Sequence, residues 1–363
     1  MRRALQWARR GVGRTAPNPP VGAVVVKNGR VVGAGFHRRA GAPHAEVEAL
    51  RRAGPRARGA TLYVTLEPCN HVGRTPPCCD AILQAGIATV VIGTKDPNPI
   101  TNGRGMAKLR RSGVRVVTGV LQAEAQRLIE PFAKTVTTGL PLVTAKVGQS
   151  VDGKIATTRG QSRWITSPEA RRMSHILRAQ ADAILVGSRT VLQDDPLLTV
   201  RYGALHRRGR PLKVIVDSRL RTPATARCVS SASPAPTLIA TTTRAGRAGA
   251  ALRKRGVDIL VLPAQKDGRV PLRPLCRQLA ARGIQSVLIE GGGEVLAGAF
   301  AERIVDRVTF FIAPILIGGR AAPSAFGGDG VPRLSRAIRL ADVTYRRVGP
   351  DLCVDARVVY PPR

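Results

Sequence analysis

The spacing of apolar residues in the first third of the chain predicts alternating strands and helices. Two apolar segments, residues 21–26 and 30–36, flank Asn28-Gly29, a dipeptide typical of a type I′ hairpin turn. Helical spacing occupies residues 44–53 and 78–85, and β-branched segments typical of strands lie at 61–65, 89–92 and 114–117. This alternation indicates an α/β layer architecture.

Residues 135–141 lack periodicity and contain a glycine and a proline. We therefore place a domain boundary there and expect domains at residues 1–140 and 141–363. Beyond the boundary the pattern begins again, with strand-like segments at 142–147, 183–186, 213–216, 237–240, 259–262 and 286–289. The second domain is therefore expected to be α/β as well.

A helix is predicted for residues 166–179, and its first residues allow two ways of capping it. Thr166 as the N-cap places Glu169 at the third helical position, which forms a capping box. Ser167 as the N-cap places Pro168 at the first helical position, where proline is favoured.

The composition supports a folded protein. The chain has 363 residues, which suggests two domains of about 100–200 residues each. Hydrophobic residues make up 44% and charged residues 22%, a globular balance. No apolar run approaches the ~18 residues of a membrane helix, and the basic N-terminus lacks the apolar region of a signal peptide. We expect a cytoplasmic protein with no membrane partner.

The net charge of +35 is spread along the chain. Residues 1–144 carry 22 basic and 7 acidic groups, a net +15, and residues 145–363 carry 36 and 16, a net +20. Only 9 of the 58 cationic residues are lysines, which indicates compositional drift toward arginine. A basic surface attracts anions, so we expect a phosphorylated small-molecule substrate, with nucleic acid as the alternative.

Three of the six cysteines, Cys69, Cys78 and Cys79, lie within eleven residues, whereas the other three are scattered. Six cysteines are too few for a disulfide scaffold in a chain of this length. Clustering of this kind in a cytoplasmic protein suggests a metal site.

His44, Cys69 and Cys78 together offer the ligands of a catalytic zinc. One histidine and two cysteines leave a fourth position open for water, whose pKa zinc lowers toward ~7. Glu46 follows His44 by two residues at the start of a predicted helix, where it can act as the general acid and base without binding the metal. The alternative is a closed structural site with Cys79 as fourth ligand. His71 is expected to line the site rather than to bind the metal.

This set matches the H-x-E and P-C motifs of zinc nucleobase deaminases, but with a departure in the cysteine spacing. Eight residues, Asn70–Pro77, separate Cys69 from Cys78, where that signature has two. We interpret the segment NHVGRTPP as an insertion that adds substrate contacts.

The segments GVGRTAPNPPVGAVVV, GFHRRAGAPHAEVEAL, TLEPCNHVGRTPPCCDAILQAGI and KDPNP resemble the deaminase half of the bifunctional riboflavin biosynthesis family. The resemblance covers residues 4–135 and implies that the aminopyrimidine or its ribose phosphate is contacted by Asn18, His37, Arg74 and Asn98. Amide groups suit a pyrimidine edge and a guanidinium suits a phosphate. Alternatively, Asn18 and Asn98, which both precede proline, are turn residues. Glu48 and Cys79 depart from the family pattern outside the ligand set.

In the second half, Glu290-Gly291-Gly292-Gly293-Glu294 joins a predicted strand to a predicted helix. A glycine-rich turn at a helix N-terminus lets the backbone approach a phosphate. It is not a dinucleotide fingerprint, which belongs to a first βα unit and is followed by an acidic residue. The alternative is a tight packing turn.

Segments 146–154, 162–167, 187–190, 193–201 and 290–294 together resemble the reductase half of the same family, whose fold is similar to dihydrofolate reductase. The resemblance covers residues 142–320, with a weaker tail to 357. It implies NADPH contacts at Gly148, Trp164, Thr190, Asp194, Ser218, Gly292, Gly293, Glu294, Val295, Leu296, Ala297 and Gly298. It implies substrate contacts at Ser162, Arg178, Leu198, Arg201 and Glu290, with Lys146 as the catalytic cation.

The resemblance implies a cytidine-deaminase-like three-layer domain followed by a dihydrofolate-reductase-like α/β domain. The first would remove an amino group from a pyrimidine ribosylamine phosphate with one zinc ion, and the second would reduce the ribosyl group with NADPH. We expect a homo-oligomer with no nucleic-acid partner. The alternative from another class is a nucleic-acid-editing protein. The very basic composition favours it, but the chain has only 12 aromatic residues, too few to suggest a surface for stacking bases. A third possibility is that one half is inactive.

The excess of arginine also suggests a preference for the 2′-phosphate of NADPH. Ser218, Arg219 and Arg221 cluster after the third predicted strand of the second domain. We expect an arginine of this cluster to contact that phosphate.

Overall fold

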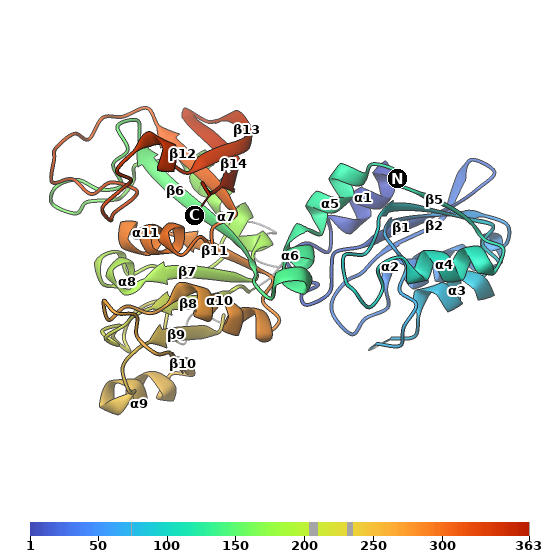
Figure 1. Ribbon diagram of the computed structural model, residues 1–363, viewed down its shortest axis with the longest axis horizontal. Helices are drawn as coiled ribbons and strands as arrows, with labels where there is room; N and C mark the ends of the chain where they lie inside the picture. Colours follow the sequence, from blue (N-terminus) through green and yellow to red (C-terminus); the bar gives the residue numbers. More distant parts are fainter. Residues whose placement is uncertain (74, 203–209, 231–234, 363) are drawn as a thin grey trace. The chain divides into compact units, whose positions relative to one another are not determined.

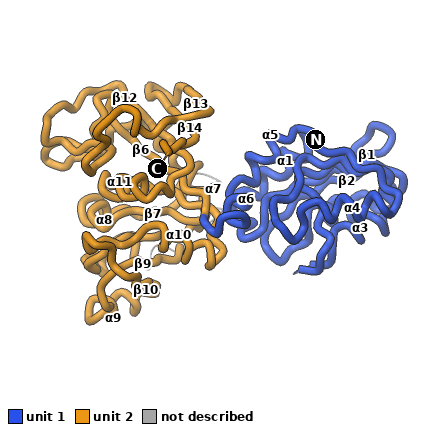
Figure 2. The backbone as a smooth tube through the Cα atoms, viewed as in Figure 1, with its two compact units in different colours: residues 1–140 blue, residues 141–363 orange. Residues whose placement is uncertain are grey.

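The computed structural model describes residues 1–73, 75–202, 210–230 and 235–362. The chain divides into two compact units, Met1–Leu140 and Pro141–Arg363 (Figure 2). Among the described residues, no helix is long and apolar enough to cross a membrane.

Unit 1 is built on a five-stranded sheet with the order β2-β1-β3-β4-β5. β1 pairs antiparallel with β2 and β3, whereas β3, β4 and β5 are parallel. The strands are β1 (Gly22–Lys27), β2 (Arg30–Phe36), β3 (Thr61–Leu66), β4 (Thr89–Thr94) and β5 (Arg115–Thr118). The helices are α1 (Arg2–Ala8), α2 (Ala45–Ala53), α3 (Cys78–Gln84), α4 (Arg104–Arg111), α5 (Gln122–Leu128) and α6 (Glu130–Thr138), with a 3₁₀ turn η1 (Gly54–Ala57).

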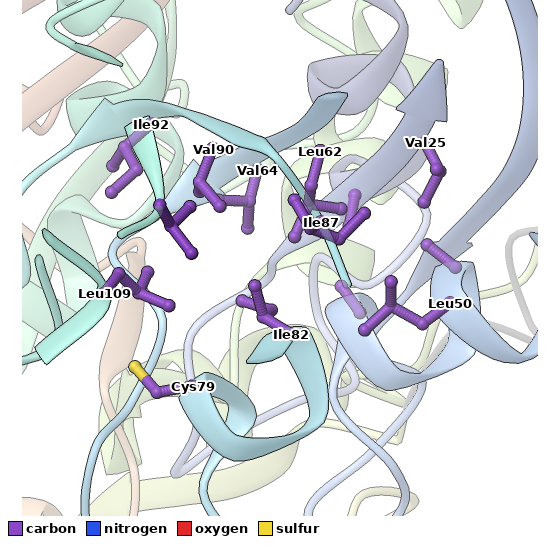
Figure 3. Packing of buried hydrophobic residues seen from close by; sticks show 14 of the residues in the cluster. Val25, Leu50, Leu62, Val64, Cys79, Ile82, Ile87, Val90, Ile92 and Leu109 are labelled. Atoms are coloured by element: carbon purple, nitrogen blue, oxygen red, sulfur yellow. The ribbon is translucent and has the colours of Figure 1, made fainter. Parts of the chain in front are cut away.

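Helices cover both faces of this sheet. On one face, α2, α3 and α4 supply side chains to an apolar cluster with β1, β3 and β4 (Figure 3). On the other face, Gly22 allows α1 to approach β1, because a Cβ at this position would lie 2.1 Å from the Ala4 carbonyl oxygen. The result is a three-layer domain whose strand ends carry the first site.

Unit 2 is built on a nine-stranded sheet with the order β10-β9-β8-β7-β11-β6-β12-β14-β13 (Figure 1). β10 through β12 in this order are parallel, and the β13–β14 hairpin adds two antiparallel strands. The parallel strands are β6 (Leu142–Ser150), β7 (Ala183–Gly187), β8 (Leu212–Val216), β9 (Thr237–Thr241), β10 (Val257–Val261), β11 (Ser286–Glu290) and β12 (Arg307–Ala313). The hairpin is β13 (Arg339–Val348) and β14 (Asp351–Val359).

The helices of unit 2 connect these strands. They are α7 (Pro168–Gln180), α8 (Ser188–Asp194), α9 (Gly246–Lys254), α10 (Leu272–Ala281) and α11 (Gly293–Ala301), with a 3₁₀ turn η3 (Leu334–Arg336). Crossover helices between parallel strands are the usual solution for such a sheet. They place the loops that follow the strands at one edge, where the second site lies.

Three local predictions have clear outcomes. Asn28 and Gly29 both have positive φ, 49° and 73°, which confirms the type I′ turn of the predicted hairpin. In α7 the capping residue is Ser167, whose side chain accepts a hydrogen bond from the Ala170 N–H, so the second capping arrangement is the one present. The aperiodic linker predicted at 135–141 is wrong in part, because α6 continues through Thr138.

Candidate functional sites

Three side chains from different parts of unit 1 converge on one point. His44 is the N-cap of α2, Cys69 follows β3, and Cys78 is the first residue of α3. One potential ligand atom from each lies within 4.8 Å of the others. His44 Nδ1 is 3.1 Å from Cys78 Sγ and 3.6 Å from Cys69 Sγ. One imidazole nitrogen and two sulfurs form a donor set that fits zinc and leaves a position for a further ligand.

The surroundings of Cys69 favour its thiolate. Hydrogen bonds from the Cys78 thiol and from His44 lower the pKa of Cys69 to about 4, against the opposing effect of burial. The backbone N–H of Cys78, at the start of α3, also donates to Cys69 Sγ at 3.3 Å. Helix N-termini stabilise thiolates in this way, and a thiolate is the form that binds metal.

Glu46 lies in the first turn of α2 and is 3% exposed. Its burial raises the pKa of the carboxyl group. Among the described residues it does not belong to the group of converging ligand atoms. A buried carboxyl group beside a metal site, but outside the ligand set, can accept and return a proton.

Cys79 does not belong to the converging group either. Its thiol donates to the carbonyl oxygens of Pro68 and Gly105, and burial raises its pKa to about 12. Figure 3 shows the side chain among the apolar residues of the unit 1 core. The closed site with Cys79 as fourth ligand is therefore not the arrangement present, because α3 directs adjacent cysteines to different sides.

Two residues expected to contact substrate lie beside the metal-site histidine. The His37 and His44 rings are edge to face with centroids 5.1 Å apart, and His37 Nε2 lies 3.1 Å from Asn18 Nδ2. Asn98 has a turn role, since its side-chain oxygen accepts the Ile100 N–H. Arg74 lies outside the described residues.

Sequence reasoning missed Glu67, a 3% exposed carboxylate two residues before Cys69. It accepts the backbone N–H groups of Asp96, Gly103 and Met106. Glu67 thereby fixes the segment that contains Asn98 against the cysteine loop. An acidic residue at the end of a buried strand was the available signal.

The second site is a cavity of about 1230 Å³ in unit 2. Among its lining residues, Arg178 of α7 donates to both carboxylate oxygens of Glu290, at 2.8 and 2.5 Å. Lys146 Nζ of β6 lies 3.8 Å from Glu290 Oε2. Burial tends to raise the pKa of Glu290, but the charges of Arg178 and Lys146 outweigh it and hold the pKa at about 2. Burial lowers the pKa of Lys146.

Most residues that the resemblance implies line this cavity. They are Lys146, Gly148, Ser162, Trp164, Arg178, Thr190, Asp194, Leu198, Arg201, Glu290 and Gly292 through Leu296. Ser162 Oγ donates to Asp194 Oδ1 at 2.9 Å. This bond links a residue expected to contact the substrate to a residue expected to contact NADPH.

Ser218, Ala297 and Gly298 are not among the lining residues. Ser218 holds neighbouring loops together, because its hydroxyl accepts the Val270 N–H and its carbonyl accepts three threonine hydroxyls. Arg219 and Arg221 do not line the cavity either, and Arg221 donates to Ser188 Oγ. The cationic side chains that do line it include Arg189 of α8.

Glycine is required at the three positions of the βα turn for different physical reasons. Gly291 and Gly292 have φ of 80° and 86°, which L side chains rarely adopt. Gly293 is needed for space, because a Cβ there would lie 3.1 Å from the Ser324 oxygen and 3.3 Å from the Gly327 nitrogen. A loop near residues 320–327 thus packs directly on the turn.

This loop lines the cavity through residues 320–327 and was missed by sequence reasoning. Lys154 Nζ donates to the Ala322 carbonyl, and the Ile155 N–H donates to the Pro323 carbonyl. Its role depends on contacts distant in sequence, and it carries no periodic pattern.

Comparison with known proteins identifies the chain. A family model described as "RibD C-terminal domain" matches residues 141–354, and one described as "Cytidine and deoxycytidylate deaminase zinc-binding region" matches residues 1–94. The riboflavin biosynthesis protein RibD of Escherichia coli is 44% identical over 365 residues, which cover 98% of this chain and 97% of the relative. This chain belongs to the RibD family. The RibD protein of Aquifex aeolicus is 42% identical, over 98% of this chain and 96% of its own length.

Solved RibD structures have the same architecture. Acinetobacter baumannii RibD superposes with a TM-score of 0.88 at 36% identity, covering 99% of this chain and 97% of its own. A Thermotoga maritima diaminohydroxyphosphoribosylaminopyrimidine deaminase/5-amino-6-(5-phosphoribosylamino)uracil reductase superposes with a TM-score of 0.85 at 38% identity, with the same coverage. The predicted fold class, a deaminase-like domain followed by a reductase domain, is confirmed.

Proposed function

We propose that this chain catalyses two successive steps of riboflavin biosynthesis. Unit 1, residues 1–140, hydrolyses the 2-amino group of 2,5-diamino-6-(ribosylamino)-4(3H)-pyrimidinone 5′-phosphate and releases ammonia. Unit 2, residues 141–363, reduces the resulting 5-amino-6-(5-phosphoribosylamino)uracil, with NADPH, to the ribityl compound. One observation carries this proposal: two sites occur in one chain. The first is a His-Cys-Cys cluster with a buried carboxyl group, and the second is a cavity lined by the ion pairs of Glu290 with Lys146 and Arg178.

In unit 1, His44, Cys69 and Cys78 would hold one zinc ion, which would supply the Lewis acidity that activates water. Glu46, a buried carboxyl group outside the ligand group, is placed to accept a proton from the attacking water and to return it to the leaving amino group. Asn18 and His37, beside the histidine ligand, hold the pyrimidine edge. Glu67 fixes the segment that contains Asn98, the fourth residue that the resemblance assigns to the substrate. Arg74 is assigned to the phosphate by the resemblance.

In unit 2, the residues that line the cavity would hold NADPH, which would supply the hydride for the first carbon of the sugar once its ring has opened to an imine. Lys146 moves a proton at the site of reduction, because burial lowers its pKa. Glu290 and Arg178 orient Lys146 and the sugar, and Arg201 binds the 5-phosphate. The Gly291–Gly293 turn at the start of α11 receives a cofactor phosphate.

We also propose the substrate class, the cellular location and the partners of the enzyme. Its substrates are small pyrimidine ribosylamine phosphates, and we place the enzyme in the cytoplasm as a homo-oligomer without a nucleic-acid or membrane partner. Metal analysis of the purified full-length chain should give one zinc per chain. The same preparation should deaminate the diaminopyrimidine and then consume NADPH. A chain free of zinc that still deaminates would contradict the assignment of unit 1.

A further inference from the structure

His175 is a buried residue of unit 2 that sequence reasoning did not single out. It lies on α7 one turn before Arg178, is 6% exposed and lines the cavity. Its Nδ1 accepts the backbone N–H of Arg201 at 3.3 Å. Its ring also meets that of Tyr202 edge to face, with centroids 4.8 Å apart. His175 therefore contacts both the backbone of Arg201 and the side chain of the next residue.

The segment that leads to Arg201 has a strained backbone. Asp195 and Leu198 have φ of 38° and 50°, in the left-handed region. Residues other than glycine rarely adopt this conformation, and it persists only where other contacts hold it. Leu198 is 2% exposed and lines the cavity with Arg201.

Besides the Asp195 N–H bond to the Val191 carbonyl within α8, three hydrogen bonds from elsewhere in unit 2 hold this segment in place. Asp195 Oδ1 accepts the Arg227 N–H at 2.7 Å, and Arg178 Nη1 donates to the Thr199 carbonyl at 3.0 Å. The third is the bond from the Arg201 N–H to His175. Two of the three come from α7, so that helix sets where the segment carrying Leu198 and Arg201 lies.

His175 can accept this bond only while Nδ1 carries no proton. Burial, together with the charges of Arg178, Arg201 and Lys146 and against that of Glu290, lowers the pKa of His175 to about 4. The ring is therefore neutral around pH 7, with its proton on Nε2.

We propose that His175 is a positioning residue of the reductase. By fixing the backbone of Arg201 through Nδ1, it holds Arg201 and Leu198 where the phosphorylated sugar binds. This inference rests on the proposed function of unit 2. It assigns His175 to binding of the pyrimidine substrate and not to hydride transfer or to binding of NADPH.

Asparagine and leucine at position 175 form a matched pair for the test. Their side chains have the same branched shape, but only asparagine offers an acceptor for the Arg201 N–H. His175→Asn places an oxygen where Nδ1 lies, whereas His175→Leu places a methyl group there. His175→Gln is a second variant without an acceptor at that point, and its polarity guards against misfolding. Each full-length variant is assayed with 5-amino-6-(5-phosphoribosylamino)uracil and NADPH, and hydrogen exchange of the Arg201 amide is measured separately.

We expect His175→Leu and His175→Gln to raise the KM for the pyrimidine about fivefold, the worth of one hydrogen bond. Their kcat and their KM for NADPH should remain near the wild-type values, and the Arg201 amide should exchange faster. His175→Asn should restore the pyrimidine KM and the amide protection. Equal KM values for the Asn and Leu variants, or unchanged amide exchange in the Leu and Gln variants, would overturn the proposal. A wild-type chain that does not reduce the pyrimidine would contradict the function of unit 2, while the exchange rates still decide the role of His175.

Discussion

Lys146 and Glu290 are register partners on the parallel strands β6 and β11, and Lys146 Nζ lies 3.8 Å from Glu290 Oε2. Neighbouring parallel strands thus bring together two residues that are distant in sequence. Arg178 completes the group from α7, and the side chains of all three are largely buried. Glu290 pairs with both cations, so replacing it tests how much these ion pairs contribute to the stability and activity of the site.

Glu290→Gln should destabilise unit 2 and abolish most reduction. Removing the carboxylate leaves two buried cations without their partner, which typically costs about 3–5 kcal/mol. Denaturant unfolding at neutral pH measures the stability, and NADPH consumption measures the activity. Asp258→Asn, which removes an exposed ion pair with Arg282, is the control and should change neither by much. Equal stabilities of the two variants would contradict this account of the site.

The same carboxylate predicts a pH dependence of stability. Its pKa of about 2 in the folded protein lies below the ordinary value, which is about 4.3 for an unfolded chain. The charge therefore contributes stability that is present above about pH 4.3 and is lost as the pH falls toward 2, about 3 kcal/mol in all. The difference in unfolding free energy between wild type and Glu290→Gln should stay constant from about pH 8 to 5 and shrink at lower pH. Shrinkage already above pH ~5 would show that Glu290 is not held by its cations.

Gly293→Ala should weaken cofactor binding. The new Cβ would press on backbone atoms of Ser324 and Gly327, so the loop that lines the cavity must shift. We expect the KM for NADPH to rise about tenfold, a loss of ~1.4 kcal/mol. Gly298→Ala, on the same helix, is the matched control, because its Cβ would meet only Leu272 Cδ1 at 3.5 Å. Alanine there should leave the KM unchanged and raise helix stability by up to about 1 kcal/mol. A larger KM effect from Gly298→Ala would favour the cofactor contact that the resemblance implies for it.

Glu46→Gln should keep zinc and lose deamination. The amide preserves the shape of the side chain but cannot move a proton, which should slow deamination by about 10³-fold. Metal analysis measures whether zinc is retained, and the rate of ammonia release measures the loss of deamination. Loss of zinc from a folded Glu46→Gln protein would show that the carboxylate is a ligand.

The strands and motifs of both units were predictable because local signals agree with the tertiary structure. The Asn28-Gly29 turn needs positive φ at both residues, and β-branched segments form the buried strands. The convergence of His44, Cys69 and Cys78 was predictable because these residue types stand in the H-x-E and P-C motifs of zinc deaminases.

Helix α6 shows why the linker prediction failed. Residues 135–141 lack apolar periodicity, yet α6 continues through Thr138, and the hydroxyls of Thr135 and Thr138 donate to carbonyls four residues earlier. Proline in its first turn and Gly139 with φ of 68° after its end are the signals that sequence analysis passed over. His175 and the loop 320–327 gave no local signal at all, because their roles come from contacts distant in sequence.

The central claim, two independent sites with successive activities in one chain, is tested most directly with Cys69→Ala. Cys79→Ala, which removes a buried thiol outside the ligand group, is the matched control. Both purified variants are given the diamino substrate and, separately, the deaminated substrate with NADPH. We predict that Cys69→Ala consumes no NADPH with the diamino substrate and reduces the deaminated one at the wild-type rate, whereas Cys79→Ala does both. Loss of reduction of the deaminated substrate in a folded Cys69→Ala protein, or retained deamination without this ligand, would contradict the account.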